Sequence, residues 1–224
     1  MQKPPLAIPR SLFFLSIFYG GMVCIAGVLG NKQVTLGPIS QLGPVLGLPP
    51  LAIEAGIFAF LLLVATSSAV AELHGRKVAN LLVLVGFVPL VTSVILTLLV
   101  LALPAAPEMP ADRLAAFNTM MGATPWIWLG GIVAYGVSQI LNVTIFSWLK
   151  GQEGNSLLWV RAAVASVLSQ IVDTLLFITI AFGTGAIGWL MGGQMLVKVV
   201  LSIILVPVLI TIFVALGRRL DRAA

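Results

Sequence analysis

Charge is what this sequence lacks most. Only 8% of its 224 residues are Asp, Glu, Lys or Arg, and 60% are hydrophobic, whereas a soluble domain usually carries about 25% charged residues. A chain with so few charges could not cover its own surface in water, so the composition predicts a membrane protein. The net charge of +5 does not indicate nucleic-acid binding, because no basic patch with interleaved aromatic residues accompanies it.

The residues and motifs of most enzyme classes are missing as well. A single cysteine, Cys24, excludes an internal disulfide, and a single histidine, His74, leaves no His/Cys cluster for a metal ion. The sequence contains no phosphate-binding Gly-x-x-x-x-Gly-Lys-Ser/Thr loop and no Gly-x-Ser-x-Gly nucleophile motif. We therefore expect no enzymatic activity, no cofactor and no metal.

What the sequence does have is six apolar runs joined by short connections. Each run is close to or above the roughly 20 residues that a helix needs to cross a bilayer; the runs are 11–29, 51–73, 79–103, 126–149, 157–182 and 187–216. The sequence predicts an all-α polytopic membrane protein with six transmembrane helices in a single domain over 1–224. The first run lacks a clear cleavage site and is interpreted as a retained span. Pro207 in the last run allows a kink or tilt.

The basic residues predict the orientation of these spans. Eight of the twelve lie on the side of the two termini: Lys3, Arg10, Arg76, Lys77, Lys150, Arg218, Arg219 and Arg222. Lys32 and Arg113 lie on the other side, and Arg161 and Lys198 lie inside apolar runs. Since basic residues collect in cytoplasmic connections, we expect both termini in the cytoplasm. Two successive halves of three spans would then have inverted topology.

The fourth and fifth runs contain a polar repeat. Ser138–Phe146 resembles Ser169–Phe177 at an offset of 31 residues, with Ser, Gln, Ile and Phe identical. Its polar residues recur at spacing i, i+3, so they share one face of each helix. The repeat predicts that polar groups of two antiparallel helices meet near the middle of the membrane.

Two charges are expected at the same depth. A rise of about 1.5 Å per residue places Asp173 ~14 Å and Lys198 ~17 Å from the outer ends of their helices. A charge there costs at least about 2.5–3.5 kcal/mol, so we expect the two residues to pair. The polar residues expected to add to this network are Gln139, Asn142, Gln170 and Gln194. Convergent polar groups at the midplane are typical of a transporter's substrate site, although buried amides also simply hold helices together.

Other polar residues lie near the ends of the runs. Glu72 ends the second run near the cytoplasmic face and Arg161 opens the fifth, while Asn31 lies at the outer end of the first. We interpret these three residues as candidates for a gate or for coupling. The segment 30–50 is rich in Gly and Pro and is interpreted as either a lid or an ordinary loop, and 104–125 is expected to be a surface loop.

Several segments together resemble the bacterial queuosine precursor transporter family, also called the vitamin-uptake-transporter-like family. The most specific are Trp159–Phe182, Lys198–Ser202 with Pro207, and Tyr135–Phe146. Shorter ones are Asn31-Lys32 and Glu72-x-x-Gly75-Arg76-Lys77-x-Ala79. The sequence departs from the family pattern at Ser68 and Asn142, where relatives carry Asp at the first position and some carry it at the second.

The resemblance implies uptake of 7-cyano-7-deazaguanine or 7-aminomethyl-7-deazaguanine across the bacterial inner membrane. On this interpretation Asp173 accepts two N–H bonds from the guanine-like edge, and Gln170, Gln139 or Lys198 donates to its carbonyl oxygen. Phe177 or Trp189 could stack on the flat base. The partners expected are thus a small molecule and membrane lipid.

Two alternatives stay open at the level of sequence. The chain could be a substrate-binding membrane subunit for another vitamin or purine-like molecule that needs a separate ATP-driven module. It could also be a non-transport scaffold that uses its Gln and Asn residues for helix association. Proton coupling and facilitated diffusion, and the oligomeric state, are equally open.

Overall fold

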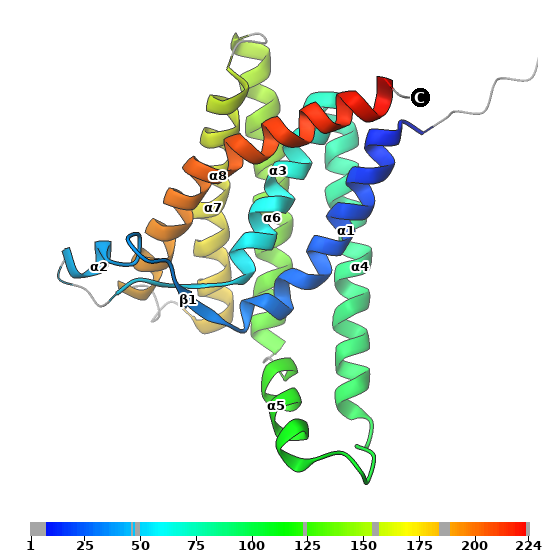
Figure 1. Cartoon of the computed structure of the whole chain (residues 1–224), viewed down its shortest axis with the longest axis vertical. Coiled ribbons are helices and arrows are strands. Elements are labelled where there is room, and N and C mark those ends of the chain that lie inside the picture. Colours follow the sequence, from blue (N-terminus) through cyan, green and yellow to red (C-terminus); the bar gives the residue numbers. More distant parts are fainter. Residues whose placement is uncertain are drawn as a thin grey trace, which may run out of the picture.

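A computed structural model describes residues 8–45, 47, 50–122, 125–153, 157–183 and 189–222. Helices dominate these residues, with two short strands (Figure 1). The elements in order are α1 (Arg10–Gly30), β1 (Gln33–Thr35), α2 (Leu42–Val45), β2 (Ala52–Glu54), α3 (Gly56–His74), α4 (Arg76–Ala102), α5 (Ala111–Met121), α6 (Pro125–Glu153), α7 (Leu158–Phe182) and α8 (Trp189–Arg222).

Six of these helices are long and apolar enough to cross a membrane: α1, α3, α4, α6, α7 and α8. This confirms the predicted all-α architecture with six spans. The start of α1 and the end of α8 lie at the same end of the bundle, together with the α3–α4 turn (Figure 1). We call this the terminal end, and the other the distal end. The halves α1–α3–α4 and α6–α7–α8 start from different ends, as two inverted halves require.

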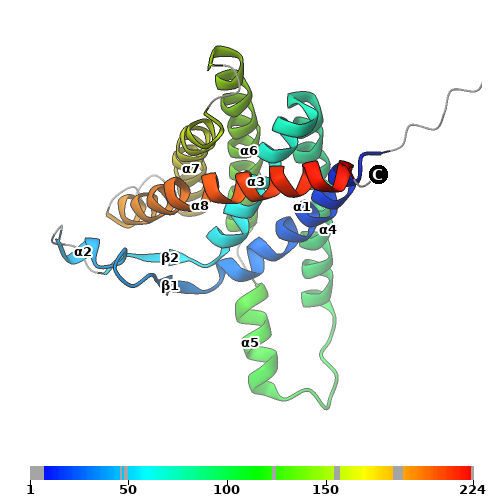
Figure 2. The ribbon, with the colours of Figure 1, turned by 45° about the horizontal axis from the view of Figure 1, so that its top comes forward.

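The transmembrane helices differ in inclination. α8 crosses the bundle steeply inclined to α6 and α7 in both views (Figures 1 and 2). Its 34 residues correspond to about 50 Å of helix, whereas the apolar core of a bilayer is about 30 Å thick. A helix of this length fits the membrane only when it is tilted. Pro207 lies within α8 without ending it.

α3 is the most buried span, and it occupies the centre of the bundle. It contacts α1, α4, α6 and α8, and its consecutive residues from Leu63 to Ala71 are all buried. Small side chains predominate in this stretch after Val64, including Ala65, Ser67, Ser68 and Ala69. Without a hydrophobic driving force between helices in lipid, such small residues permit close contact between neighbouring backbones. α3 thus links the two halves.

Two segments differ from the sequence expectation. The second apolar run was expected to be helical from residue 51, but Ala52–Glu54 form β2, which pairs antiparallel with β1. Short apolar runs fit a strand as well as a helix, and here the main-chain partner decides. Residues 104–125 were expected to be a surface loop, yet they contain α5, an exposed helix without a buried residue.

Three helices are tied together at the terminal end by polar side chains. The Asp221 carboxylate of α8 accepts hydrogen bonds from the backbone N–H (2.9 Å) and hydroxyl (2.6 Å) of Ser11 in α1. His74 Nε2, at the end of α3, lies 2.8 Å from the same hydroxyl. Because the serine gives its hydrogen to the carboxylate and not to the imidazole, these residues cannot act as a Ser-His-Asp nucleophile. They fix helix ends.

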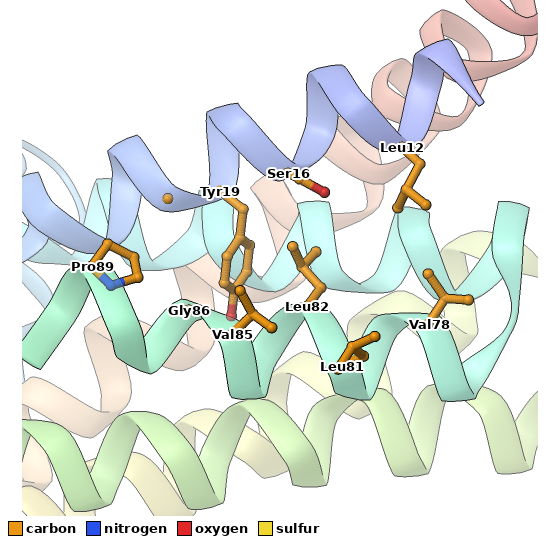
Figure 3. Close-up of a pocket in the computed structure, with 10 residues that line it drawn as sticks. Leu12, Ser16, Tyr19, Val78, Leu81, Leu82, Val85, Gly86 and Pro89 are labelled. Carbon is orange, nitrogen blue, oxygen red and sulfur yellow. The ribbon is translucent and has the colours of Figure 1, made fainter. Parts of the chain in front are cut away.

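A tyrosine pair joins the two halves beside α4. The hydroxyls of Tyr19 in α1 and Tyr135 in α6 lie 2.9 Å apart. Tyr19 forms the floor of an apolar groove of about 240 Å³ between α1 and α4, and it passes directly over Gly86 (Figure 3). A Cβ atom added to Gly86 would lie 2.8 Å from Cε1 of Tyr19 and even closer to the Tyr135 hydroxyl. Glycine is therefore required here for close approach.

This close approach generates a prediction about stability. Gly86→Ala forces both tyrosine rings to move, and overpacking of this kind typically costs about 1–3 kcal/mol. We expect a lower midpoint of thermal unfolding for the purified protein in detergent. Gly20→Ala is the matched control, because Gly20 lines the same groove and its added Cβ would meet nothing within 4 Å. Equal midpoints for the two variants would contradict the close contact.

Candidate substrate site

A cavity lies between the two halves of the bundle, on the distal side of its middle. It has a volume of about 550 Å³, and every transmembrane helix together with β2 and α5 contributes to its wall. Small-molecule sites in proteins usually measure about 300–1,000 Å³ and lie between packed elements. Asn31 and Met121 line it at the distal end of the bundle, and Asp173 and Lys198 line it deeper in. Its size and place suit a small ligand.

A buried ion pair lies in the wall of this cavity. Lys198 Nζ in α8 is 3.2 Å from Asp173 Oδ2 in α7, and both side chains are 9% exposed. The other carboxylate oxygen of Asp173 accepts a hydrogen bond of 3.3 Å from the Ser138 hydroxyl of α6. The sequence prediction that the two charges would pair is met by this geometry. The contact with Ser138 also brings together the two copies of the polar repeat.

A further ionisable residue, Glu54, lines the same cavity from β2. Burial raises the pKa of its carboxyl group, while the ammonium of Lys198 lowers the pKa and the carboxylate of Asp173 raises it. Glu54 thus shares the cavity with both members of the pair. Sequence reasoning gave Glu54 no role, because the 51–54 stretch was assigned to a helix end. Only the pairing of β2 with β1 reveals its place.

Aromatic side chains supply flat surfaces in the cavity. Phe177 follows Asp173 by one helical turn on α7, and Phe60, Trp128 and Tyr135 line the cavity from α3 and α6. A planar heterocycle can stack on such rings. Phe177, a stacking candidate from the sequence, therefore lies where stacking is geometrically possible. The side chain of Trp189, the other candidate, lies outside the described residues.

Four amides were expected to join the ion pair, and the structure separates them from it. Gln139 and Asn142 in α6 are fully buried, and they bond α3 instead: Ser67 donates to Gln139 Oε1 at 3.1 Å and Asn142 donates to Ser68 at 2.9 Å. Gln170 is fully buried one turn from Asp173, and neither end of its amide has a partner among the described residues. Gln194, 7% exposed, makes no hydrogen bond to the described part of the chain. The expected single network is wrong.

These amides belong to a polar seam that continues from the cavity towards the terminal end. Besides them it contains buried hydroxyl residues of three helices, α3, α7 and α8, namely Ser67, Ser68, Ser166, Ser169 and Ser202. Several polar atoms of this seam have no hydrogen-bond partner among the described residues: Gln139 Nε2, Asn142 Oδ1, both amide atoms of Gln170, and the hydroxyls of Ser166 and Ser202. Buried polar groups without partners are costly and rare in folded proteins. The seam is thus a buried region with several unused hydrogen-bond donors and acceptors.

The seam ends at a cluster of charges near the terminal end, which we call the Glu72 cluster. Glu72 Oε2 in α3 lies 3.1 Å from Lys150 Nζ in α6 and 3.3 Å from Arg161 Nη2 in α7. Arg161, expected at the membrane edge, is only 1% exposed and lies over the ring of Phe146 at 5.0 Å from the centroid. The cluster therefore closes the three helices at the end of the seam.

Asn31, the remaining candidate from the sequence, lies far from this cluster. Its side-chain amide donates to the carbonyl oxygens of Gly27 and Val28, both at 3.2 Å, at the last turn of its own helix. It lines the cavity near the distal end. The contacts made by Asn31 are those of a helix C-cap.

Comparison with known proteins gives two matches. Residues 54–212 match a family described as "Putative vitamin uptake transporter", a stretch that includes Glu54, the Glu72 cluster, Asp173 and Lys198. A protein of Bacillus subtilis (strain 168) named "Probable queuosine precursor transporter" is 30% identical over 113 residues. That alignment covers 50% of this chain and 48% of the relative, so the chain spans about half the length of the curated relative that it matches.

No solved structure matches the chain. The family match nevertheless extends from β2 to the second half of α8 and thus covers most of the six-helix bundle. The chain belongs to the vitamin uptake transporter family.

Proposed function

We propose that this protein takes up a queuosine precursor, 7-cyano-7-deazaguanine or 7-aminomethyl-7-deazaguanine, through alternating exposure of the cavity to the two sides of the inner membrane. The observation that carries the proposal is the cavity of about 550 Å³ with a buried Asp173–Lys198 pair in its wall. An ionised pair at membrane depth is expensive and marks a substrate pathway more often than a structural contact. The family match and the name of the relative support the substrate class.

The chemistry of the cavity suits a guanine-like base. Such a base presents two adjacent N–H donors, which one carboxylate can accept side by side, and a carbonyl oxygen that needs a donor. Asp173 would accept and Lys198 would donate, so the base would take over the contacts that the two residues now make with each other. Phe177, one turn further along α7, would stack on the base. The base would thereby loosen the link between α7 and α8.

The Glu72 cluster would act as the gate on the terminal side. In this structure the cavity reaches the distal end, whereas the seam and the cluster separate it from the terminal end. Opening the gate would part α3 from α6 and α7, and the unpartnered seam amides would then meet water or the passing base. This offers a physical reason for polar groups that bond to nothing in the closed seam.

The basic residues support the orientation. Eight of the twelve Lys and Arg residues lie on the side of the termini, so the terminal end would face the cytoplasm. The cavity would then open outward, and the Glu72 cluster would be the cytoplasmic gate. Asn31 would lie at the outer mouth.

The first test is uptake of labelled 7-cyano-7-deazaguanine by cells that lack both their own synthesis and their own transporter. We expect the chain to restore uptake and queuosine in tRNA without added protein partners. Failure to restore either, with the protein detected in the membrane, would overturn the proposed substrate. Uptake that appears only with a separate ATPase module would instead favour a partner-dependent binding subunit.

Asp173→Asn is expected to lower uptake by about tenfold or more, since hydrogen bonds to charged groups contribute about 1.5–3 kcal/mol. The same change leaves Lys198 buried without its partner, which costs about 3–5 kcal/mol of stability. The amount of folded protein in the membrane must therefore be measured for each variant. The double variant Asp173→Asn/Lys198→Met removes both charges and should fold, yet remain defective. Glu108→Gln, an equivalent change in an exposed turn, should transport normally. Normal uptake by the double variant would refute the role of the pair.

The gate is tested by the reactivity of a cysteine inside the seam. In a Cys24→Ala background, Ser67→Cys places a thiol at a position that is fully buried. In inside-out vesicles we expect slow modification by a membrane-impermeant thiol reagent, and several-fold faster modification when Glu72→Gln is added, because Lys150 and Arg161 lose the negative charge that both compensate. Glu108→Gln serves as the control addition. Unchanged reactivity after Glu72→Gln would argue against a gate at this cluster.

A further inference from the structure

The charges in the wall of the cavity do not balance. Asp173 and Glu54 are acidic, and Lys198 is the one basic residue among the described residues that line it. Lys198 pairs with Asp173 at 3.2 Å, whereas the Glu54 carboxylate has no hydrogen bond or ion pair within the described part of the chain. Glu54 is therefore an acidic group of the cavity wall that the Asp173–Lys198 pair does not compensate.

Glu54 is not needed to hold β2 in place. β2 is fixed by main-chain pairing, in which Glu54 lies opposite Gln33, and by the adjacent hydrogen bond from the Ala55 N–H to the Lys32 carbonyl oxygen at 2.8 Å. The neighbouring side chains of Leu51 and Ile53, 4% and 1% exposed, supply the hydrophobic anchor. A partly buried carboxylate without a partner lowers stability. Its place in the cavity is better explained by a ligand than by folding.

The position of Glu54 also suits contact with a second part of the ligand. Asp173 belongs to α7 and Glu54 to β2, so the two carboxylates reach the cavity from different elements. A ligand that spans the cavity can meet both at once. A carboxylate in a region of low dielectric favours a cationic partner and binds a neutral nitrile less well, because a nitrile nitrogen is itself only an acceptor.

We propose that Glu54 binds a cationic group of the substrate and thereby selects a base with a protonated amine over its neutral counterpart. This rests on the function proposed above, and there it means that 7-aminomethyl-7-deazaguanine is preferred to 7-cyano-7-deazaguanine. Asp173 holds the guanine-like edge that both compounds share. Glu54 pairs with the aminomethyl ammonium, which only one of them carries.

Equilibrium binding of both compounds to the purified full-length protein in detergent tests this assignment. We expect wild-type protein to bind the aminomethyl compound more tightly than the cyano compound. In Glu54→Gln the ratio of the two affinities should fall by about tenfold or more, as expected for a lost charge-assisted contact, while binding of the cyano compound is retained. Glu54→Asp should keep the direction of the preference, and Glu108→Gln should match wild type.

The outcomes separate the two proposals. If wild-type protein binds neither compound, the proposed function fails and the preference fails with it. If wild-type protein binds both and the affinity ratio is the same in Glu54→Gln, only the role of Glu54 is overturned. An equal loss of affinity for both compounds in Glu54→Gln would also overturn it, because a residue that shapes the cavity would affect the shared base and not the substituent.

Discussion

The structure depends on an ion pair that compensates two charges buried away from water. Asp173 and Lys198 neutralise each other at 3.2 Å, and Ser138 donates to the remaining carboxylate oxygen. Because the charge of each partner is compensated by the other, the pair links α7 to α8 and, through Ser138, to α6. A ligand able to replace one of these contacts therefore acts directly on helix association.

The same requirement explains why the two sides of the bundle differ. On the distal side the cavity leaves room for solvent or ligand around the pair, and the acidic residue Glu54 lies there. On the terminal side two of the amides bond α3, and several other polar groups have no hydrogen-bond partner among the described residues. Glu72 then compensates two cations at once. Under the proposed function, one carrier state that is open on one side and sealed on the other would account for both halves of this asymmetry.

Much of this architecture could be predicted from sequence, since long apolar runs, and charged residues inside them, are visible without knowing which helices are neighbours. The six spans and the Asp173–Lys198 pair belong to that class. The partners of the amides do not belong to that class: Gln139 and Asn142 are part of the polar repeat, yet they bond α3, and only the packing of distant helices decides this. Glu54 was overlooked for the same reason, since the strand pairing that places it involves a residue 21 positions earlier, Gln33. Arg161 was assigned to the interface because its acceptor, Glu72, lies on another helix.

The covalent link between the two halves has a mechanical consequence. It consists of the end of α4, an extended stretch and α5, none of whose residues is buried, and it projects beyond the bundle at the distal end (Figure 1). The two halves are therefore joined by a link that contributes little buried surface of its own. Under the proposed function, a rotation of one half against the other would be resisted mainly by the helix faces that meet at α3, and not by the connecting chain.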